Sequence, residues 1–209
     1  MNVIEAYEIW SEQYDTNENK TRDLEAISLN ETLTNLSFQN CLEIGCGTGK
    51  NTSLLLNKAS MVTAIDLSNE MLEIAKNKIK SDNVEFLQAD ITNEWSFVGN
   101  KKYDLITFSL VLEHIENIDN IFQKIDTIIL NKGYVYIGEL HPFKQYNGSK
   151  ARFETNEGVQ IVTCFTHNIS DFTRAAKKYN FEILCINEYF DNNDTKQIPR
   201  ILTILLKKH

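Results

Sequence analysis

The stretch Leu42-Glu43-Ile44-Gly45-Cys46-Gly47-Thr48-Gly49-Lys50 places three glycines at alternate positions directly after a short apolar run. A helix-like pattern follows it, which predicts a buried strand, a tight turn and a helix N-terminus. Glycine permits positive φ and allows a ligand to approach the backbone. The helix behind the turn offers free N–H groups and the positive end of its dipole. The stretch therefore predicts a cradle for a cofactor.

The spacing of these glycines separates the possible classes of cofactor. Enzymes that bind dinucleotides use G-x-G-x-x-G, whereas this chain reads G-x-G-x-G and has Lys50 where the third glycine would be needed. The G-x-x-x-x-G-K-S/T pattern of phosphate-binding loops is missing from the sequence. Both nucleotide classes are therefore disfavoured.

The run from Glu43 to Gly49 resembles the first motif of the class I S-adenosylmethionine-dependent methyltransferases. Two more motifs of this family have counterparts in Ala64-Ile65-Asp66-Leu67-Ser68-x-x-Met71-Leu72 and in Gln88-Ala89-Asp90-Ile91. The resemblance covers about residues 38–140 by motif and the rest of the chain only by topology. It implies S-adenosylmethionine as cofactor and transfer of its methyl group.

Length and composition predict one globular domain over residues 1–209, with 42% hydrophobic and 24% charged residues. We expect residues 1–37 to form an N-terminal helical cap and residues 141–167 an acceptor-side insertion. The net charge of −8 disfavours nucleic acids and anionic membrane surfaces as partners. The sequence shows neither a signal-peptide pattern nor an apolar segment near 18 residues. Four cysteines without C-x-x-C spacing predict reduced thiols and a cytoplasmic location.

Hydrophobic periodicity predicts a doubly wound α/β fold. Expected strands lie at about 40–44, 61–65, 84–87, 103–108, 134–140, 182–189 and 201–207, with helices between them. Strands that alternate with helices form a mostly parallel sheet covered on both faces. The last two strands follow each other directly, which predicts an antiparallel C-terminal pair. The resemblance implies the same Rossmann-like, seven-stranded sheet. Thr21, Ser68 and Ser170 are the predicted N-caps of three helices.

Ligands in open α/β sheets bind beyond the carboxyl ends of the strands. Asp66 follows the first glycine by about 20 residues, where a carboxylate can accept both ribose hydroxyls. Leu67 and Met71 could cover the adenine ring, and Asp90 could accept a hydrogen bond from its amine. Alternatively, Asp66 only caps the helix at Ser68 and Asp90 only starts a turn. The predicted cofactor site also includes Gly45, Cys46, Gly47, Gly49, Ile91 and Ser109.

Three more residues enter the cofactor site through the resemblance. In the family, the position of Glu43 helps to hold the amino end of the methionine, and residues like Tyr14 and Arg22 close over its carboxylate. The alternatives are a Glu43 bonded to nearby backbone N–H groups, a Tyr14 packed in the core and an Arg22 exposed on a helix.

A sulfonium methyl is already activated, so positioning and exclusion of water provide much of the catalysis. A base is needed if the acceptor is a hydroxyl or a protonated amine. The candidates are His114, Glu139 and His141, because alternate residues at a strand end share one face and histidine titrates near neutrality. Alternatively, His114 caps a helix and His141 positions the turn before Pro142. A metal set of these three is disfavoured, because the i, i+4 ligand spacing is missing.

Residues 141–167 are expected to form the acceptor pocket. Tyr146 and Phe153 would give it aromatic walls, and Arg152 could bind a substrate carboxylate with two hydrogen bonds. Arg152 could equally pair with Glu154 or Glu157 in a small hairpin centred on residues 156–158. Enzymes that methylate base amines carry Asn/Asp-Pro-Pro-aromatic after the fourth strand. Here that place reads Ser109-Leu110-Val111-Leu112, which favours a small molecule.

The sequence thus predicts a methyltransferase that acts on an oxygen or nitrogen of a small metabolite. Alternatives from other classes are a catalytically silent sensor or scaffold that binds S-adenosylmethionine or S-adenosylhomocysteine, and an aminopropyl transferase. The second would need an acidic polyamine pocket, for which Glu139 is the only candidate. The identity of the acceptor, the use of a base, and the choice between monomer and homodimer stay open.

Overall fold

The computed structural model describes residues 3–155 and 158–209, and for Glu12 and residues 153–155 it describes the backbone alone. Its centre is a seven-stranded sheet in the order β3-β2-β1-β4-β5-β9-β8. The strands are β1 Asn40–Ile44, β2 Met61–Asp66, β3 Val84–Gln88, β4 Tyr103–Ser109, β5 Ile129–Leu140, β8 Phe181–Tyr189 and β9 Ile201–Lys208. β9 runs antiparallel to both β5 and β8, and the other neighbours are parallel. The predicted fold class, strand number and antiparallel C-terminal pair are confirmed.

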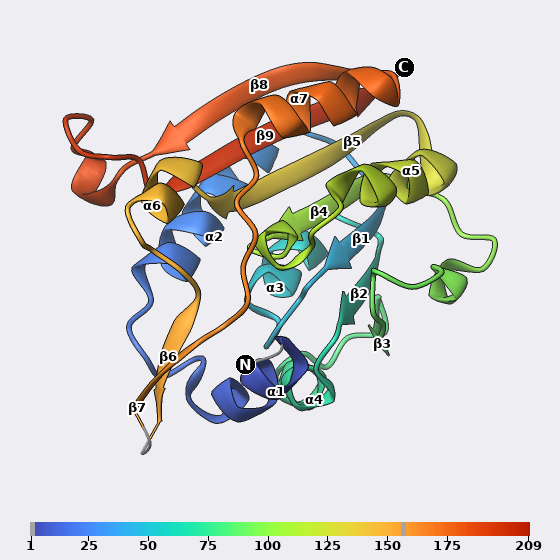
Figure 1. The fold of residues 1–209 in the computed structure, drawn as a ribbon. Coiled ribbons are helices and arrows are strands. Elements are labelled where there is room, and N and C mark those ends of the chain that lie inside the picture. The colour runs from blue at the N-terminus through green and yellow to red at the C-terminus, as the bar shows by residue number, and fades with distance from the viewer. Residues whose placement is uncertain (1–2, 156–157) are drawn as a thin grey trace.

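Helices cover both faces of this sheet. They are α1 Val3–Trp10, α2 Lys20–Leu33, α3 Lys50–Leu56, α4 Asn69–Lys78, α5 Ile118–Ile128, α6 Pro142–Tyr146 and α7 Ile169–Lys178. Short 3₁₀ turns lie at η1 Ser11–Gln13, η2 Ser96–Val98, η3 Leu112–His114 and η4 Asp191–Asn193. Figure 1 shows α5 and α7 in front of the sheet, with α2 and α3 behind it.

The alternation of side chains along β1 explains why the sheet is covered twice. Leu42 and Ile44 pack into the core under α5 and α7, whereas Cys41 packs into the core under α2 and α3. Successive side chains of a strand point to opposite faces, so a strand buried on both faces must be apolar throughout. Burial of each aliphatic side chain stabilises the fold by roughly 1.5–3 kcal/mol.

The predicted helix starts are correct for one helix and wrong for two. The Ser68 hydroxyl caps α4 by accepting the N–H of Met71 at 3.2 Å. However, α2 is capped by Asn19 rather than Thr21, and α7 by a capping box of Asn168 and Asp171 rather than by Ser170. In both cases an asparagine that lies two residues earlier is an equally good cap, so the helix begins sooner.

Two further segments lie beyond the carboxyl ends of the parallel strands. Residues 152–155 (β6) and 158–161 (β7) form a separate antiparallel pair, whose predicted turn at residues 156 and 157 lies outside the described residues. Figure 1 shows the N-terminal segment descending from α2 to α1 alongside this pair, and α1 packs against α4. In the described ranges, no helix is both long and apolar enough to span a bilayer.

Candidate functional site

The glycine turn between β1 and α3 is fixed to the next strand by its own backbone. The N–H groups of Gly45 and Cys46 both donate to the carbonyl of Ile65, at 2.8 and 2.9 Å. A Cβ on Gly45 (φ +74°) would lie 2.1 Å from Cγ2 of Val111, whereas a Cβ on Gly47 (φ +53°) would meet no atom within 4 Å. Packing therefore requires the first glycine, while the second leaves open space.

Asp66 ends β2 and faces this space. Its Oδ2 accepts the Gly47 N–H at 2.8 Å, and its Oδ1 accepts the Ser68 N–H at 2.9 Å. Burial raises the pKa of Asp66, although these backbone hydrogen bonds oppose the shift. A carboxylate has about four acceptor positions, so Asp66 holds the turn and still has acceptor capacity for a ligand.

An inner cavity of about 210 Å³ lies at the ends of β1, β2 and β4. Its lining brings together ten of the predicted site residues: Tyr14, Gly45, Gly47, Asp66, Leu67, Met71, Asp90, Ile91, Ser109 and His114. Asp90 also organises its own loop, because it accepts the N–H and the hydroxyl of Thr92 at 2.8 and 2.7 Å. The turn-forming alternative for Asp90 is thus present together with a position in the cavity wall.

Other predicted cofactor residues support the turn from behind and do not line this cavity. Glu43 is 3% exposed and accepts the Thr52 hydroxyl at 2.5 Å. Burial raises the pKa of Glu43 to about 8. Cys46 is buried among the residues of the α2–α3 core, and a Cβ on Gly49 would lie 2.8 Å from Cδ1 of Ile79.

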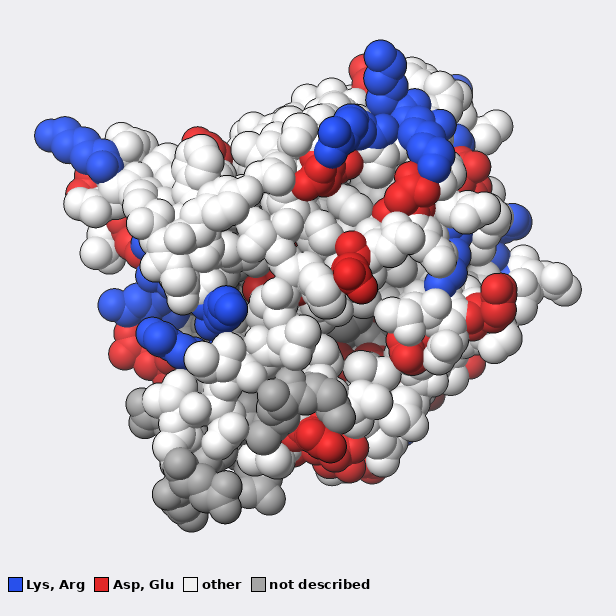
Figure 2. All heavy atoms as spheres, in the orientation of Figure 1, with Lys and Arg blue, Asp and Glu red and all other residues white. Residues whose placement is uncertain are grey.

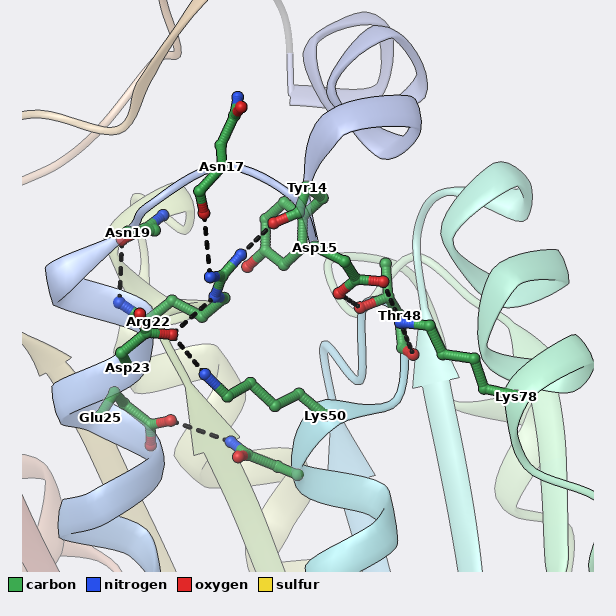
Figure 3. A network of polar contacts seen from close by, with 11 residues as sticks. Tyr14, Asp15, Asn17, Asn19, Arg22, Asp23, Glu25, Thr48, Lys50 and Lys78 are labelled. Carbon is green, nitrogen blue, oxygen red and sulfur yellow. Dashed lines mark hydrogen bonds and ion pairs between the residues drawn. The ribbon is translucent and has the colours of Figure 1, made fainter.

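Arg22 also lies outside the cavity lining, and it shapes the N-terminal segment. Its guanidinium donates to the carbonyl of Tyr14, to that of Asn17 at 3.1 Å and to Asp23 at 3.1 Å. Figure 3 shows this arginine gathering the loop between η1 and α2. The hydrogen bonds hold the Tyr14 backbone, and the Tyr14 ring lines the inner cavity.

Two ion pairs fasten the N-terminal segment onto the glycine turn (Figure 3). Asp15 accepts the Thr48 hydroxyl at 2.7 Å and pairs with Lys78 of α4. Asp23 pairs with Lys50, the first residue of α3. The segment thus closes over the cavity through contacts to residues on both sides of the turn.

A wider outer cavity of about 910 Å³ lies between the N-terminal segment and residues 149–152 and 159. Its lining comprises Tyr7, Trp10, Gln13, Tyr14, Asn17, Glu18, Asn19, Lys20, Thr21, Leu110, Glu113, Leu140, Ser149, Lys150, Ala151, Arg152, Val159 and Arg200. Tyr7, Tyr14 and Leu110 line both cavities, so these three residues form the boundary between them.

A hydrogen bond at this boundary joins Tyr7 to His114. The Tyr7 hydroxyl lies 3.0 Å from Nε2 of His114, and Nδ1 lies 2.9 Å from the carbonyl oxygen of Thr163. Because a carbonyl can only accept, Nδ1 carries the proton in the neutral ring, and Nε2 accepts from the tyrosine. Burial raises the pKa of Tyr7 well above its usual range.

Glu139 and His141 are placed differently from the expectation that both face the cleft, since neither lines either cavity. The Glu139 carboxylate accepts three backbone N–H groups, from Val111, Leu112 and Glu113, at 3.0, 2.8 and 3.2 Å. Burial raises the pKa of Glu139. The Glu139 carboxylate thus binds the backbone of Val111 and η3 instead of facing the cleft.

His141 is fully buried at the start of α6. Its Nδ1 accepts the Phe143 N–H at 3.2 Å, and its Nε2 lies 3.0 Å from Glu188. Burial lowers the pKa of His141, although Glu188 opposes the shift. The ring caps a helix and fastens it to β8, which agrees with the turn-positioning alternative. Within the described ranges, no cluster of His, Cys, Asp and Glu is suited to a metal ion.

The expected acceptor residues divide between the cavity and the surface. Arg152 lines the outer cavity, whereas Tyr146 is 63% exposed and donates to Asn168 at 2.5 Å. The side chain of Phe153 lies outside the described part of the chain, as do those of Glu154 and Glu157, the alternative partners of Arg152.

Sequence reasoning missed several wall residues, among them Tyr7, Leu110, Lys150 and Arg200. The spacing of Tyr7, Trp10 and Tyr14 is that of one helix face and was the available signal for the first. Leu110 adopts φ +58° and donates its N–H to the Gly138 carbonyl at 2.8 Å. A leucine rarely adopts this conformation, so no local sequence pattern predicts the backbone conformation of Leu110.

Residues 42–137 match the family described as "Methyltransferase domain". The chain is 25% identical over 227 residues to an uncharacterized methyltransferase of Emericella nidulans, which covers 88% of this chain and 77% of that protein. It is 31% identical over 126 residues to malonyl-acyl-carrier-protein O-methyltransferase 2 of Ilyobacter polytropus, covering 59% of this chain and 45% of that protein. The chain thus spans less than half the length of the second relative.

The solved structure of DhpI in complex with S-adenosylhomocysteine superposes with a TM-score of 0.76 at 20% identity, covering 98% of this chain and 94% of that one. At this identity the likeness establishes the fold. The family match contains all three motifs at the strand ends, and the seven-stranded order carries them to one edge of the sheet. The domain match, the strand-end motifs and the fold together support a class I S-adenosylmethionine-dependent methyltransferase.

Proposed function

We propose that this enzyme methylates an oxygen or nitrogen of a small acceptor, with the adenosyl cofactor in the inner cavity and the acceptor in the outer one. The observation that carries this proposal is the meeting of the two cavities at Tyr7, Tyr14 and Leu110. A donor and an acceptor on either side of this boundary would be brought together without crossing bulk water, which is how positioning accelerates transfer.

The inner cavity has the chemistry that an adenosyl ligand requires. Asp66 has acceptor capacity for ribose hydroxyls, and Asp90 offers a second carboxylate for an amine. Met71 and Ile91 are buried apolar residues in the same wall, suited to a flat ring. The open space at Gly47 admits a ligand against the backbone. When bound, S-adenosylmethionine supplies a methyl group activated by its sulfonium.

His114 is the base that we propose for an acceptor that must lose a proton. Its Nε2 is the unprotonated nitrogen of the neutral ring, and Tyr7 stands between this nitrogen and the outer cavity. A proton that leaves the acceptor can pass to the Tyr7 oxygen as the tyrosine proton passes to Nε2. Glu139 then acts as a positioning residue, because its three hydrogen bonds hold η3, which includes His114.

The name of the Ilyobacter relative, an O-methyltransferase, supports oxygen as the methylated atom. We place a small acceptor in the outer cavity, whose walls come from the N-terminal segment and from residues near β6. A silent sensor would need the same inner cavity, so transfer itself must be measured.

The test combines binding with transfer. Asp66→Asn should weaken S-adenosylhomocysteine binding by calorimetry on the order of tenfold or more, since one charge-assisted acceptor is lost. Asp82→Asn, an exposed aspartate outside both cavities, is the matched control. Labelled S-adenosylmethionine is then incubated with a low-molecular-weight metabolite fraction. Label on small products supports the proposal, and saturable binding without transfer would establish the sensor instead.

The proposed base is tested by Tyr7→Phe and His114→Gln. Both variants should lower the rate of labelled transfer while S-adenosylhomocysteine affinity changes little for Tyr7→Phe. Alkali releases methanol from a methyl ester and leaves ethers and N-methyl groups intact. If transfer is unchanged in both variants, or if the product is alkali-labile and hence a methyl ester, the proposed base is not needed.

A further inference from the structure

The outer cavity gathers positive charge in an acidic protein. The whole chain has 29 acidic and 21 basic residues. The lining of this cavity reverses that balance, since four cations and two carboxylates contribute to it: Lys20, Lys150, Arg152 and Arg200 against Glu18 and Glu113. Figure 2 shows Lys and Arg side chains gathered in the same region, between α6 and the β6–β7 pair.

Two of these cations are already engaged. Arg200 donates to both carboxylate oxygens of Asp191, at 2.5 and 2.7 Å, and to the Thr21 hydroxyl at 3.0 Å. Lys20 lies 4.0 Å from Glu18, a contact between exposed side chains that contributes little. Arg200 is thus a neutralised part of the wall.

For the other two cations, the described part of the chain offers no such partner. Among the side chains that the structure describes, none forms an ion pair with Lys150 or Arg152. Glu113 does not compensate them well, because burial raises its pKa and favours the neutral acid. Among the described residues of its lining, the cavity therefore retains an excess of positive charge at Lys150 and Arg152.

We propose that the acceptor carries an anionic group, a carboxylate or a phosphate, which Arg152 and Lys150 bind. This inference rests on the proposed function, in which the outer cavity holds the acceptor. The guanidinium offers a planar fork that matches two oxygens of either anion, and the ammonium adds a point charge. The two cations line the outer cavity alone, so the anion lies on the side away from the adenosyl cofactor.

The charge also gives specificity. A neutral acceptor of the same shape would leave both cations without a counter-charge, and a cationic acceptor would be repelled by them. The rest of the protein is acidic, so attraction is confined to this cavity and does not extend to a polyanion such as a nucleic acid. The acceptor class is thus a small organic anion.

Calorimetry on the full chain saturated with S-adenosylhomocysteine tests this proposal with three probes of similar shape: benzoate, phenyl phosphate and benzamide. At least one anion should bind on the order of tenfold more tightly than the neutral amide, and the preference should fall as salt is added. Tighter benzoate binding assigns the site to carboxylates, and tighter phenyl phosphate binding assigns it to phosphate esters.

The variants Arg152→Gln and Lys150→Gln should each weaken anion binding on the order of tenfold and leave S-adenosylhomocysteine affinity unchanged, since one charge-assisted contact is lost in each. Arg152→Lys should recover part of the loss. Lys177→Gln, an exposed cation of α7 outside both cavities, is the matched control. Equal binding of all probes, or variants that behave like Lys177→Gln, would overturn the proposal. If the wild type itself does not bind S-adenosylhomocysteine, the proposed cofactor site is overturned instead.

Discussion

Substitution of Gly45 by alanine should lower the free energy of unfolding by about 2–4 kcal/mol. Two costs add. Its φ of +74° costs an alanine roughly 1–2 kcal/mol. The new Cβ would lie 2.1 Å from Cγ2 of Val111, and overpacking of this kind costs about 1–3 kcal/mol. A smaller term opposes them, because alanine restricts the unfolded chain by about 0.4–1 kcal/mol.

Gly47→Ala separates the two costs. Its φ of +53° imposes comparable backbone strain, but its Cβ would meet no atom within 4 Å. The expected loss of stability is therefore only about 1 kcal/mol, whereas a methyl group here enters the space that we assign to the cofactor. Gly47→Ala should thus bind S-adenosylhomocysteine poorly while it remains well folded.

The contact itself is tested by a double-mutant cycle with Val111→Ala, which removes the clashing methyl group. Urea unfolding followed by circular dichroism gives the four free energies of unfolding. The coupling between the two positions should be about 1–3 kcal/mol in favour of the double variant. Equal losses for Gly45→Ala and Gly47→Ala, or no coupling to Val111, would show that the close approach does not limit this turn.

Three further predictions follow from buried or paired carboxylates. The pKa of Glu43 is raised to about 8, so the folded protein keeps a proton that the unfolded chain releases above about pH 4.5. The wild type should therefore lose stability relative to Glu43→Gln between pH 5 and 8, by up to about 1.4 kcal/mol per pH unit. Parallel profiles of urea stability against pH for the two proteins would contradict this. Glu139→Gln should lower the free energy of unfolding by about 1–3 kcal/mol, since an amide cannot accept all three N–H groups. It should also slow methyl transfer more than it weakens S-adenosylhomocysteine binding. Unchanged stability would show that the three hydrogen bonds do not stabilise the fold. Asp15→Asn, which loses the ion pair with Lys78, should change stability by less than about 1 kcal/mol and accelerate limited proteolysis of residues 1–19; equal cleavage rates would show that this pair does not hold the segment.

The sequence predicts which residues meet at the inner cavity, because each of them follows a local pattern. Gly45, Asp66 and Asp90 each follow a strand that is evident from apolar runs, and parallel strands bring their carboxyl ends to one edge. The topology then gathers the residues with no knowledge of side-chain packing. The same reasoning identified Glu139 as a strand-end residue. It could not reveal that η3 presents three N–H groups to it, because that contact depends on the path of a loop with Leu110 at positive φ.

The outer cavity, the proposed acceptor site, is assembled differently. Its walls come from residues near 7–21, from 110–113, from 149–152, from Val159 and from Arg200. No common period or spacing connects these segments. Arg152 shows the consequence: its residue type suggested anion binding, but only the structure places Lys150 beside the same cavity and shows Arg200 neutralised by Asp191. A chain can therefore keep the local motifs to which we assign the methyl donor while these separate segments vary independently. For this reason, the charge balance of the outer cavity is better evidence for the acceptor than any motif that the family shares.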